Sequence, residues 1–210
     1  MWCCRRDCLS SLLVAPCDTC VMAESPGLFA PDTPPGFHYR ENFISLSDEL
    51  GLVNEIGNVA FSDFALRGVV ARRRVAFFGQ AYDRGAVGPL PDFLLPLRSE
   101  IARWAEVPPE AFAMALINEY RPRTPIGWHR DAPQYDIVAG ISLLSSCRMK
   151  FRPYRSPGTA SSTERRTATH EIVLARRSAY LLTQAARTAF EHHIPPVAEL
   201  RYSITYRTLR

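Results

Sequence analysis

Apolar residues recur at helical spacing in two segments of the N-terminal half. In the first, residues 43–59 (FISLSDELGLVNEIGNV), the apolar positions lie three or four residues apart. Ser47, followed by Asp48 and Glu49, has the character of a helix N-cap and an acidic first turn. A second run with the same spacing covers residues 91–104. We therefore predict two amphipathic helices in this half of the chain.

From Ala113 onward, the hydrophobic period changes from that of a helix to that of a strand. Short β-prone runs alternate with turn or polar segments: AMALINEY, DIVAGISLL, RMKFRPY, HEIVLARRSAYLL, AFEHHI and LRYSITYRTL. The basic run at residues 72–79 (RRRVAFFG) is also strand-like. Strands that follow helices indicate an α+β, mainly β fold, in which residues 113–210 form a β-sandwich or barrel.

The first 35 residues differ from the rest of the chain. They contain five of the six cysteines and show no sustained period. Cys17 and Cys20 have the spacing of half a metal or redox site, but no matching second pair accompanies them. We interpret residues 1–35 as a flexible leader and residues 36–210 as a single domain. The polar stretch at 155–169 is predicted to be a surface loop.

Composition narrows the class of protein without deciding it. The chain has 210 residues, of which 47% are hydrophobic, and a formal net charge of +4. This balance is typical of a globular domain and suits an anionic partner such as nucleic acid without requiring one. No apolar stretch approaches the roughly 18 residues of a membrane span. The apolar run at residues 12–15 is too short for a secretory signal, so we predict a cytoplasmic monomer with no membrane partner.

The string GWHRDAP carries the first candidate chemistry. His129 and Asp131 are two apart, so on a strand the imidazole and the carboxylate face the same side. They would supply two ligands of a 2-His-1-carboxylate triad for iron(II), although alone the motif also fits an ordinary surface ion pair. The candidates for the third ligand are His38, His170, His192 and His193. Of these, His38 and His170 rank low, and because His192 and His193 are adjacent and face opposite sides of an extended segment, only one of the two can be the ligand.

The last predicted strand carries a second pattern. One of its faces presents Arg201, Ser203, Thr205 and Arg207. If this face is buried, its two arginines need an anionic partner, and a dicarboxylic acid supplies one in bidentate geometry. The alternative is a solvent-exposed face. Upstream, Asn118 and Tyr120 place an amide and a phenol on one side of a strand, where both can donate to a carboxylate. An ordinary half-buried strand edge also explains that pair.

Taken in order, N-x-Y, H-x-D, H and R-x5-R resemble the AlkB family of iron(II)- and 2-oxoglutarate-dependent dioxygenases. The resemblance covers about residues 36–210 and is carried by the strings INEYRPRTPIGWHRD, IVAGISLL, FEHHIPPV and RYSITYR. It implies a double-stranded β-helix, or jelly roll, with N-terminal helices supporting one sheet. It implies three iron ligands, namely His129, Asp131 and His192. It implies five contacts to 2-oxoglutarate, namely Asn118, Tyr120, Arg201, Ser203 and Arg207, with Ser203 standing where the family often has asparagine.

The resemblance also implies a reaction. With iron(II), 2-oxoglutarate and O2, such an enzyme oxidatively demethylates N-alkylated bases in DNA or RNA and releases formaldehyde, succinate and CO2, as in repair of DNA alkylation damage. A substrate lid is expected over residues 67–85, with Arg74 and Tyr82 binding the base. Gln134 is a further candidate substrate contact. Nucleic-acid repair members often carry acidic residues after H-x-D, whereas this chain has Ala-Pro-Gln at 132–134. This departure leaves open a different alkylated base, an RNA base or a substrate that is not a nucleic acid. The alternative is the same oxygenase chemistry on a tRNA modification, a methylated protein side chain or a small metabolite.

Overall fold

The two longer helices both lie in the first half of the chain, where strands also precede and separate them, and strands dominate the rest. The computed structural model describes residues 33–66, 69–81, 85–86, 88–155 and 169–210. These residues belong to one compact unit, Pro31–Arg210. Most of the predicted leader, nearly all of the polar insertion and Tyr82 therefore lie outside the described residues. No helix in the described ranges is long and apolar enough to cross a membrane.

Helix α1 (Leu46–Gly57) confirms the first predicted helix but begins earlier than its predicted cap. Its N-cap is Ser45, whose side chain accepts a hydrogen bond from the backbone of Asp48, while the Asp48 carboxylate accepts one from the backbone of Ser45. This reciprocal capping box needs an acceptor three residues after the cap. Asp48 therefore selects Ser45 rather than Ser47 as the cap, and the prediction of Ser47 was wrong.

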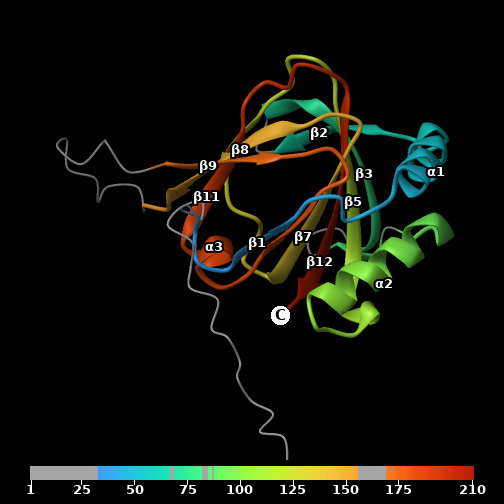
Figure 1. Ribbon diagram of the computed structural model, residues 1–210, viewed down its shortest axis with the longest axis horizontal. Helices are drawn as coiled ribbons and strands as arrows, with labels where there is room; N and C mark the ends of the chain where they lie inside the picture. The colour runs from blue at the N-terminus through green and yellow to red at the C-terminus, as the bar shows by residue number, and fades with distance from the viewer. Residues whose placement is uncertain (1–32, 67–68, 82–84, 87, 156–168) are drawn as a thin grey trace, which may run out of the picture. The chain divides into compact units, whose positions relative to one another are not determined.

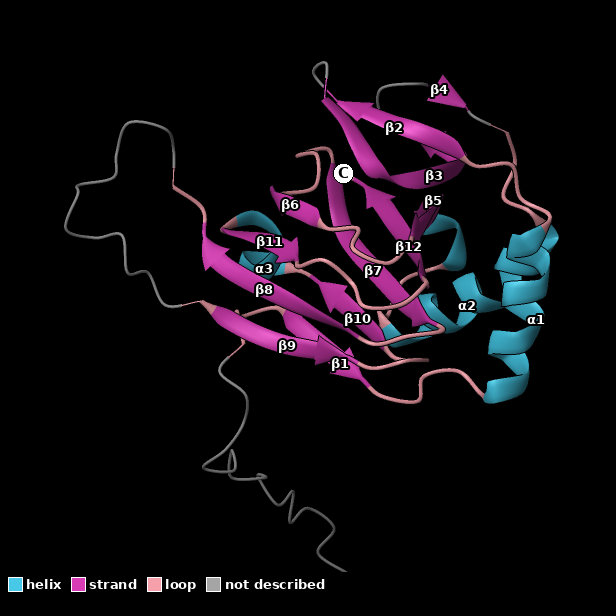
Figure 2. Cartoon of the chain, turned by 90° about the horizontal axis from the view of Figure 1, so that it is seen from above, coloured by secondary structure: helices cyan, strands magenta, loops and turns pink. Residues whose placement is uncertain are grey.

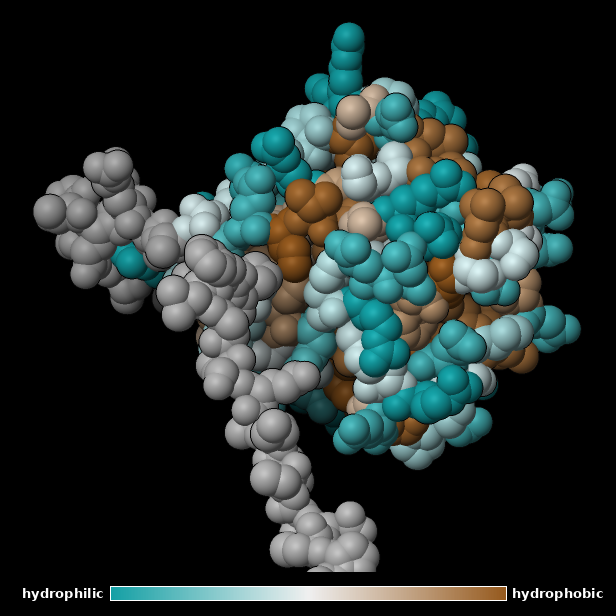
Figure 3. Space-filling model, in the orientation of Figure 1, coloured by the Kyte–Doolittle hydropathy of each residue, from teal (hydrophilic) through white to brown (hydrophobic). Residues whose placement is uncertain are grey.

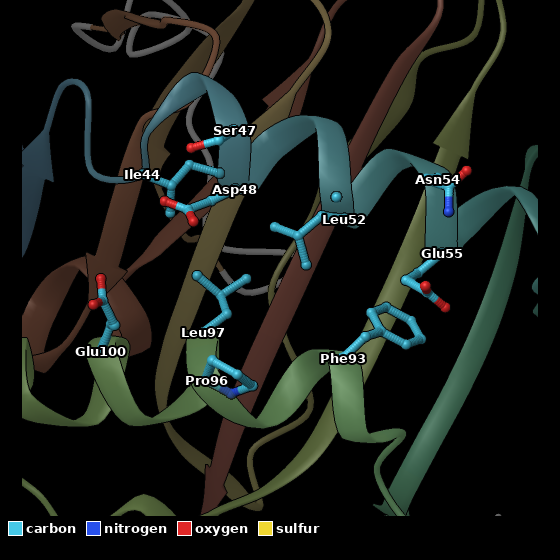
Figure 4. A pocket seen from close by; sticks show the side chains of 11 residues that line it. Ile44, Ser47, Asp48, Leu52, Asn54, Glu55, Phe93, Pro96, Leu97 and Glu100 are labelled. Atoms are coloured by element: carbon cyan, nitrogen blue, oxygen red, sulfur yellow. The ribbon is translucent and has the colours of Figure 1, made fainter.

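The second predicted helix is also present, as α2 (Leu95–Trp104), after a short 3-10 turn at Asp92–Leu94. A second 3-10 turn, Pro109–Ala111, leads into the first strand of the β-rich half. A groove of about 430 Å³ lies between α1 and α2, where Leu52 and Leu97 point toward each other (Figure 4). This groove belongs to the helix layer and is lined by none of the candidate site residues.

The described strands form two antiparallel sheets (Figures 1 and 2). The large sheet has the order β1 (Phe37–Arg40), β10 (Ala179–Leu182), β7 (Tyr135–Leu143), β12 (Arg201–Leu209), β5 (Phe112–Tyr120), β3 (Val69–Ala81) and β2 (Ser62–Leu66), and β4 (Gly85–Ala86) pairs with β3. The small sheet has the order β6 (Ile126–His129), β11 (Phe190–Ile194), β8 (Cys147–Pro153) and β9 (His170–Leu174). Two antiparallel sheets with supporting helices confirm the predicted mainly β, jelly-roll architecture.

The structure differs from the predicted runs in several places, and its strands β1, β2 and β6 lie outside those runs. The run HEIVLARRSAYLL is two strands, β9 and β10, because the chain turns at Arg177, which has a positive φ of 65°. A short helix, α3 (Gln184–Thr188), precedes β11 and was not predicted. Both features are short, and a five-residue helix gives too little periodicity to be recognised in the sequence.

Apolar side chains form two core layers, one on each face of the large sheet. Between the helices and the sheet lie residues such as Ile56, Ile101 and Ile204. Between the two sheets lie residues such as Met114, Phe151 and Leu182. Apolar side chains also reach the surface at the right of Figure 3, where Figure 1 shows α1, which carries two exposed leucines. The candidate site belongs to the second layer, between the sheets.

Candidate active site

The three predicted metal-ligating side chains meet between the two sheets. His129 ends β6 and is paired in register with His192 on β11, and their ring centroids are 4.2 Å apart. The Nε2 atom of His192 lies 3.8 Å from Oδ2 of Asp131. Strand β6 stops at His129, so Asp131 follows the strand instead of lying on it as the alternation predicted. Its carboxylate nevertheless lies within the cluster, and its side chain is 5% exposed.

The orientation of each imidazole suits metal binding at Nε2. His129 directs Nδ1 to the carbonyl oxygen of Gly127 at 2.8 Å. A hydrogen bond of this kind fixes the ring and leaves the other nitrogen as the ligand. His193 faces the other way, as expected, because its Nδ1 lies 2.7 Å from the carbonyl oxygen of Ile126 and its ring packs on Trp128. His192, and not His193, therefore contacts the His129–Asp131 pair.

Electrostatics keep this cluster in the form that a metal cation requires. Burial, and then the neighbouring His129, lower the pKa of His192 to about 3. Burial likewise lowers the pKa of His129. For Asp131, burial acts to raise the pKa, but Arg207 and the two histidines outweigh it and hold the pKa below its ordinary value. At neutral pH the cluster is therefore two neutral imidazoles and one carboxylate, which are the protonation states of metal ligands.

The donor set fits iron(II) by its chemistry, but its atoms do not form a closed coordination shell. Among the described residues, no group of three or more His, Cys, Asp or Glu side chains is arranged so that it could hold a metal ion as it stands. Oδ1 of Asp131 is instead held by Arg207, through Nε at 2.9 Å and Nη2 at 2.8 Å. Two imidazoles and a carboxylate that leave coordination positions open are the usual donors for non-haem iron(II).

The arginines of β12 point between the sheets and are not solvent-exposed. Arg201 is 1% exposed, donates from Nε to Oγ of Ser142 at 2.9 Å, and lies 5.1 Å from the ring centroid of Tyr120. The Arg207 side chain is 11% exposed. In both residues, Nη1 is buried with no hydrogen-bond partner among the described residues. Buried donors left unpaired in this way match the carboxylates of an anionic ligand such as 2-oxoglutarate.

The N-x-Y pair lies beside these arginines on the neighbouring strand. Across β5 and β12, Tyr120 pairs in register with Arg201, and Asn118 pairs with Ser203. Nδ2 of Asn118 lies 3.5 Å from Oγ of Ser203. Strand β5 is an interior strand of the large sheet, and both residues of the motif are buried. The interpretation as a half-buried strand edge is thus excluded. The five predicted cosubstrate contacts lie on the same side of two neighbouring strands, β5 and β12.

Comparison with known proteins identifies the family. A family model described as the 2OG-Fe(II) oxygenase superfamily matches residues 74–207. The chain belongs to this superfamily. Membership confirms the expected class of enzyme, a 2-oxoglutarate-dependent dioxygenase, and its cofactors iron(II), 2-oxoglutarate and O2.

Individual relatives support the expected resemblance to AlkB proteins. The chain is 25% identical over 182 residues to the "Alkylated DNA repair protein ALKBH8 homolog" of Arabidopsis thaliana, a match that covers 77% of this chain and 51% of that protein. It thus spans about half the length of that relative. Among solved structures, OsALKBH1 has a TM-score of 0.62 at 13% identity and covers 83% of this chain and 98% of its own. A prolyl hydroxylase from Trichoplax adhaerens has a TM-score of 0.59 at 15% identity, with 83% of each chain covered. These structures support the fold alone.

Within this superfamily fold, β3 brings a different arginine to the site from the one predicted. Successive residues of a strand face opposite sides. Arg74 is ion-paired with Glu119 and lies over Phe61, a residue that packs with the helix-side core. Arg73 donates from Nε to Oδ1 of Asn118 at 3.1 Å. The structure therefore brings Arg73, and not Arg74, toward the proposed cosubstrate contacts.

The structure says less about the other two predicted substrate contacts, Tyr82 and Gln134. Tyr82 lies outside the described residues. The side-chain oxygen of Gln134 is buried without a hydrogen-bond partner in the described structure, and its backbone oxygen accepts a hydrogen bond from the backbone of Arg210. Gln134 thus lies in the turn after H-x-D, close in sequence to Asp131, but in the described part of the chain no hydrogen bond joins it to the metal-ligating residues.

Sequence reasoning missed three residues that shape the superfamily's oxygenase site here. From α3, Arg187 donates to two backbone oxygens of the turn at 132–135 and so fixes the segment after H-x-D. No sequence signal pointed to it, because α3 was not predicted. Ser142 was also missed, although a polar residue within an apolar strand is a signal that could have found it. The buried ring of Tyr180 lies against Gly140, where a Cβ atom would overlap it, and its burial raises its pKa.

Proposed function

We propose that this protein oxidatively demethylates N-alkylated bases in DNA or RNA and releases formaldehyde, succinate and CO2, as a repair enzyme for alkylation damage does. One observation carries the proposal: two neutral imidazoles and a carboxylate meet beside two buried arginines whose Nη1 donors are unpaired in the described structure. The AlkB-type name of a relative and of a structural neighbour supports a nucleic-acid substrate.

In this proposal the metal is held by His129, Asp131 and His192. When bound, iron(II) and 2-oxoglutarate together activate O2 for hydroxylation of a C–H bond, and a hydroxylated N-methyl group then separates as formaldehyde. The protein's contribution is to present two neutral imidazoles and one carboxylate, and their perturbed pKa values keep those states at neutral pH. Because Arg207 already holds one oxygen of Asp131, it orients that carboxylate.

The cosubstrate is bound by the polar residues of β5 and β12. Arg201 is buried in the sheet interior and offers its unpaired Nη1 to a carboxylate, in an environment of low dielectric that strengthens the ion pair. Asn118, Tyr120 and Ser203 supply hydrogen-bonding groups on the same side. The Arg207 guanidinium contacts Asp131, and in this proposal its unpaired Nη1 also binds the cosubstrate.

A base inside a duplex cannot reach such a buried cluster, so the substrate nucleotide must leave the stack or come from a single strand. The lid segment that includes β3 is suited to bind it. Arg73 lies 4.4 Å from the ring centroid of Phe64, so a basic and an aromatic side chain stand together beside the site. Such pairs serve phosphate contact and base stacking. Tyr82 and Gln134 are further proposed contacts of the base.

The test is a panel of methylated single- and double-stranded DNA and RNA oligomers, assayed for formaldehyde with iron(II) and 2-oxoglutarate. We expect formaldehyde from at least one oligomer, and binding to that oligomer that weakens as salt rises. If 2-oxoglutarate is consumed without formaldehyde from any oligomer, the substrate is instead a tRNA modification, a methylated protein side chain or a small metabolite. If the purified protein binds no iron(II), the metal site itself is wrong.

A further inference from the structure

The charged side chains that face the site carry an excess of positive charge. Asp131 is the carboxylate of the described cluster, whereas three arginines, Arg73, Arg201 and Arg207, reach it or its neighbours. Three positive charges and one negative charge leave a net charge of +2. Bound iron(II) and the dianion of 2-oxoglutarate carry opposite charges of equal size, so they do not remove this excess. A substrate approaching the metal therefore meets a positive field.

Arg73 is the member of this group that comes from the lid. Its Nε atom donates to Asn118, and its guanidinium packs over the ring of Phe64. It is close enough to Asp131 and Arg207 to interact electrostatically with both, and burial lowers its pKa. Arginine nevertheless stays protonated in proteins. A fixed cation on a strand of the proposed lid thus stands beside Asn118, one of the proposed cosubstrate contacts.

No acidic residue stands at positions 132–134, directly after the H-x-D motif, to balance this charge, and Asp136 beyond them is 60% exposed and lies 3.8 Å from Nε of Arg210. Positions 132–134 are alanine, proline and glutamine. The acidic side chains nearest in the strands are engaged elsewhere: Glu119 pairs with Arg74 and Arg121, and Glu191 pairs with Arg152. A base that is cationic when methylated, such as N3-methylcytosine, would be repelled without compensation in a buried site. A neutral methylated base offers carbonyl oxygens, and a guanidinium donates well to such acceptors.

We propose, in an inference that rests on the proposed function, that the substrate is a neutral N-alkylated base that presents a carbonyl oxygen to Arg73. Cationic N-alkylated bases are excluded by charge. Arg73 is then the residue that determines specificity. Arg74, its neighbour on the strand, takes no part because it faces the helix side and is paired with Glu119.

The experiment compares two oligomers that are identical except at one base. One carries N3-methylcytosine and the other N3-methyluracil, which has the same ring and the methyl group on the same nitrogen but is neutral at pH 7. Formaldehyde release gives kcat/KM, and fluorescence anisotropy without O2 gives binding independently of turnover. We expect the neutral base to be favoured about tenfold or more in both measurements. Equal use of the two bases, or a preference for the cation, overturns the inference.

Variants at Arg73 test whether this residue causes the preference for the neutral base. Arg73→Gln should reduce the preference between the two bases about tenfold and leave the KM for 2-oxoglutarate within about a factor of two. Arg73→Glu should favour the cation. Arg72→Gln, at the exposed neighbouring position, is the matched control and should keep the preference. A raised KM for 2-oxoglutarate in Arg73→Gln with an unchanged base preference would assign Arg73 to the cosubstrate and overturn the inference.

The demethylation proposal and the charge inference are contradicted by different outcomes. If neither these two oligomers nor any other oligomer of the methylated panel releases formaldehyde, but the protein binds the neutral base more tightly in a manner that depends on Arg73, the demethylation proposal is wrong and the charge inference holds. If formaldehyde is released but mainly from the cationic base, demethylation holds and the charge inference is wrong. If no oligomer of the methylated panel, these two included, binds or reacts while 2-oxoglutarate is consumed, both are wrong.

Discussion

On the helix-covered face of the large sheet, the buried carboxylate of Glu49 is fully paired. It accepts hydrogen bonds from Nε of Arg176 at 2.6 Å and from the backbone of Leu144 at 2.8 Å. On the opposite face, Arg201 and Arg207 are also buried, but each keeps an Nη1 donor that has no partner in the described residues. The buried charge on one face of the sheet thus has partners within the described structure, whereas the buried charges on the other face keep unpaired donors.

The difference distinguishes charged residues that stabilise the fold from charged residues that bind a ligand. An unpaired buried donor costs about 1–3 kcal/mol, and the cost is larger when the group is charged. A fold retains such a donor where a ligand supplies the missing partner, because the cost is then recovered on binding. The helix face is therefore built for stability and the site face for binding, and substitutions on the two faces should have different consequences.

The largest effect is expected at the metal ligands. His129→Ala removes one of the two imidazoles of the cluster, so iron(II)- and 2-oxoglutarate-dependent turnover should fall about 1,000-fold or more, while the far-UV circular dichroism stays that of the wild type. The matched control is His193→Ala, because His193 faces outward against Trp128. It should retain turnover within about a factor of three. Turnover by the His129→Ala protein at the wild-type rate would remove the iron assignment.

A smaller effect, and the most direct test of the two faces, comes from one replacement made on each. Arg201→Met should raise the KM for 2-oxoglutarate about tenfold or more, because a carboxylate loses its buried cation. It should not lower the free energy of unfolding of the ligand-free protein, since that cation lacks a full set of partners. Glu49→Met should do the reverse and lower the free energy of unfolding by about 3 kcal/mol with an unchanged KM.

Urea unfolding and steady-state kinetics on the same two purified proteins measure both quantities. Equal losses of stability in Arg201→Met and Glu49→Met would show that the site face is held together as the helix face is. A KM for 2-oxoglutarate that does not change in Arg201→Met would separate Arg201 from the cosubstrate.

Residue spacing predicted the parts of the fold that depend on periodicity. Both long helices, the β-rich half and the shared face of Arg201 and Arg207 on β12 follow from the positions of apolar and polar residues, whereas the burial of that face does not. The pairing of His129 with His192 does not, because it depends on which strands become neighbours, and that is decided by long-range packing. Only the resemblance to AlkB proteins joined these two positions before the structure was known.

The choice between adjacent residues was harder to make from the sequence. In the run of three arginines on β3, alternation says that Arg73 and Arg74 face opposite sides, but it does not say which side is the site. Glu119 decides this, since it pairs in register with Arg74 across β3 and β5 and forms an ion pair with it. A cross-strand partner of this kind is invisible until the register of the two strands is known.

The smallest effect concerns pH and the burial of His192 in the metal-free protein. Burial lowers the pKa of this imidazole from an ordinary 6.5 to about 3. Between these values the unfolded chain binds a proton that the folded protein does not, so the free energy of unfolding should decrease as pH falls from about 6.5 towards 3. One such histidine contributes a slope of about 1.4 kcal/mol per pH unit. Asp131, whose pKa is lowered, adds to the loss only when the pH falls below the ordinary value of a carboxyl.

Urea unfolding in the presence of a chelator at pH 7, 6 and 5 measures the slope, and His192→Gln should reduce it by this amount. Because a protonated imidazole cannot bind a metal, the same burial predicts that iron(II) affinity changes little between pH 6 and 8. A slope that stays the same in His192→Gln would mean that this imidazole is not kept neutral by the site face.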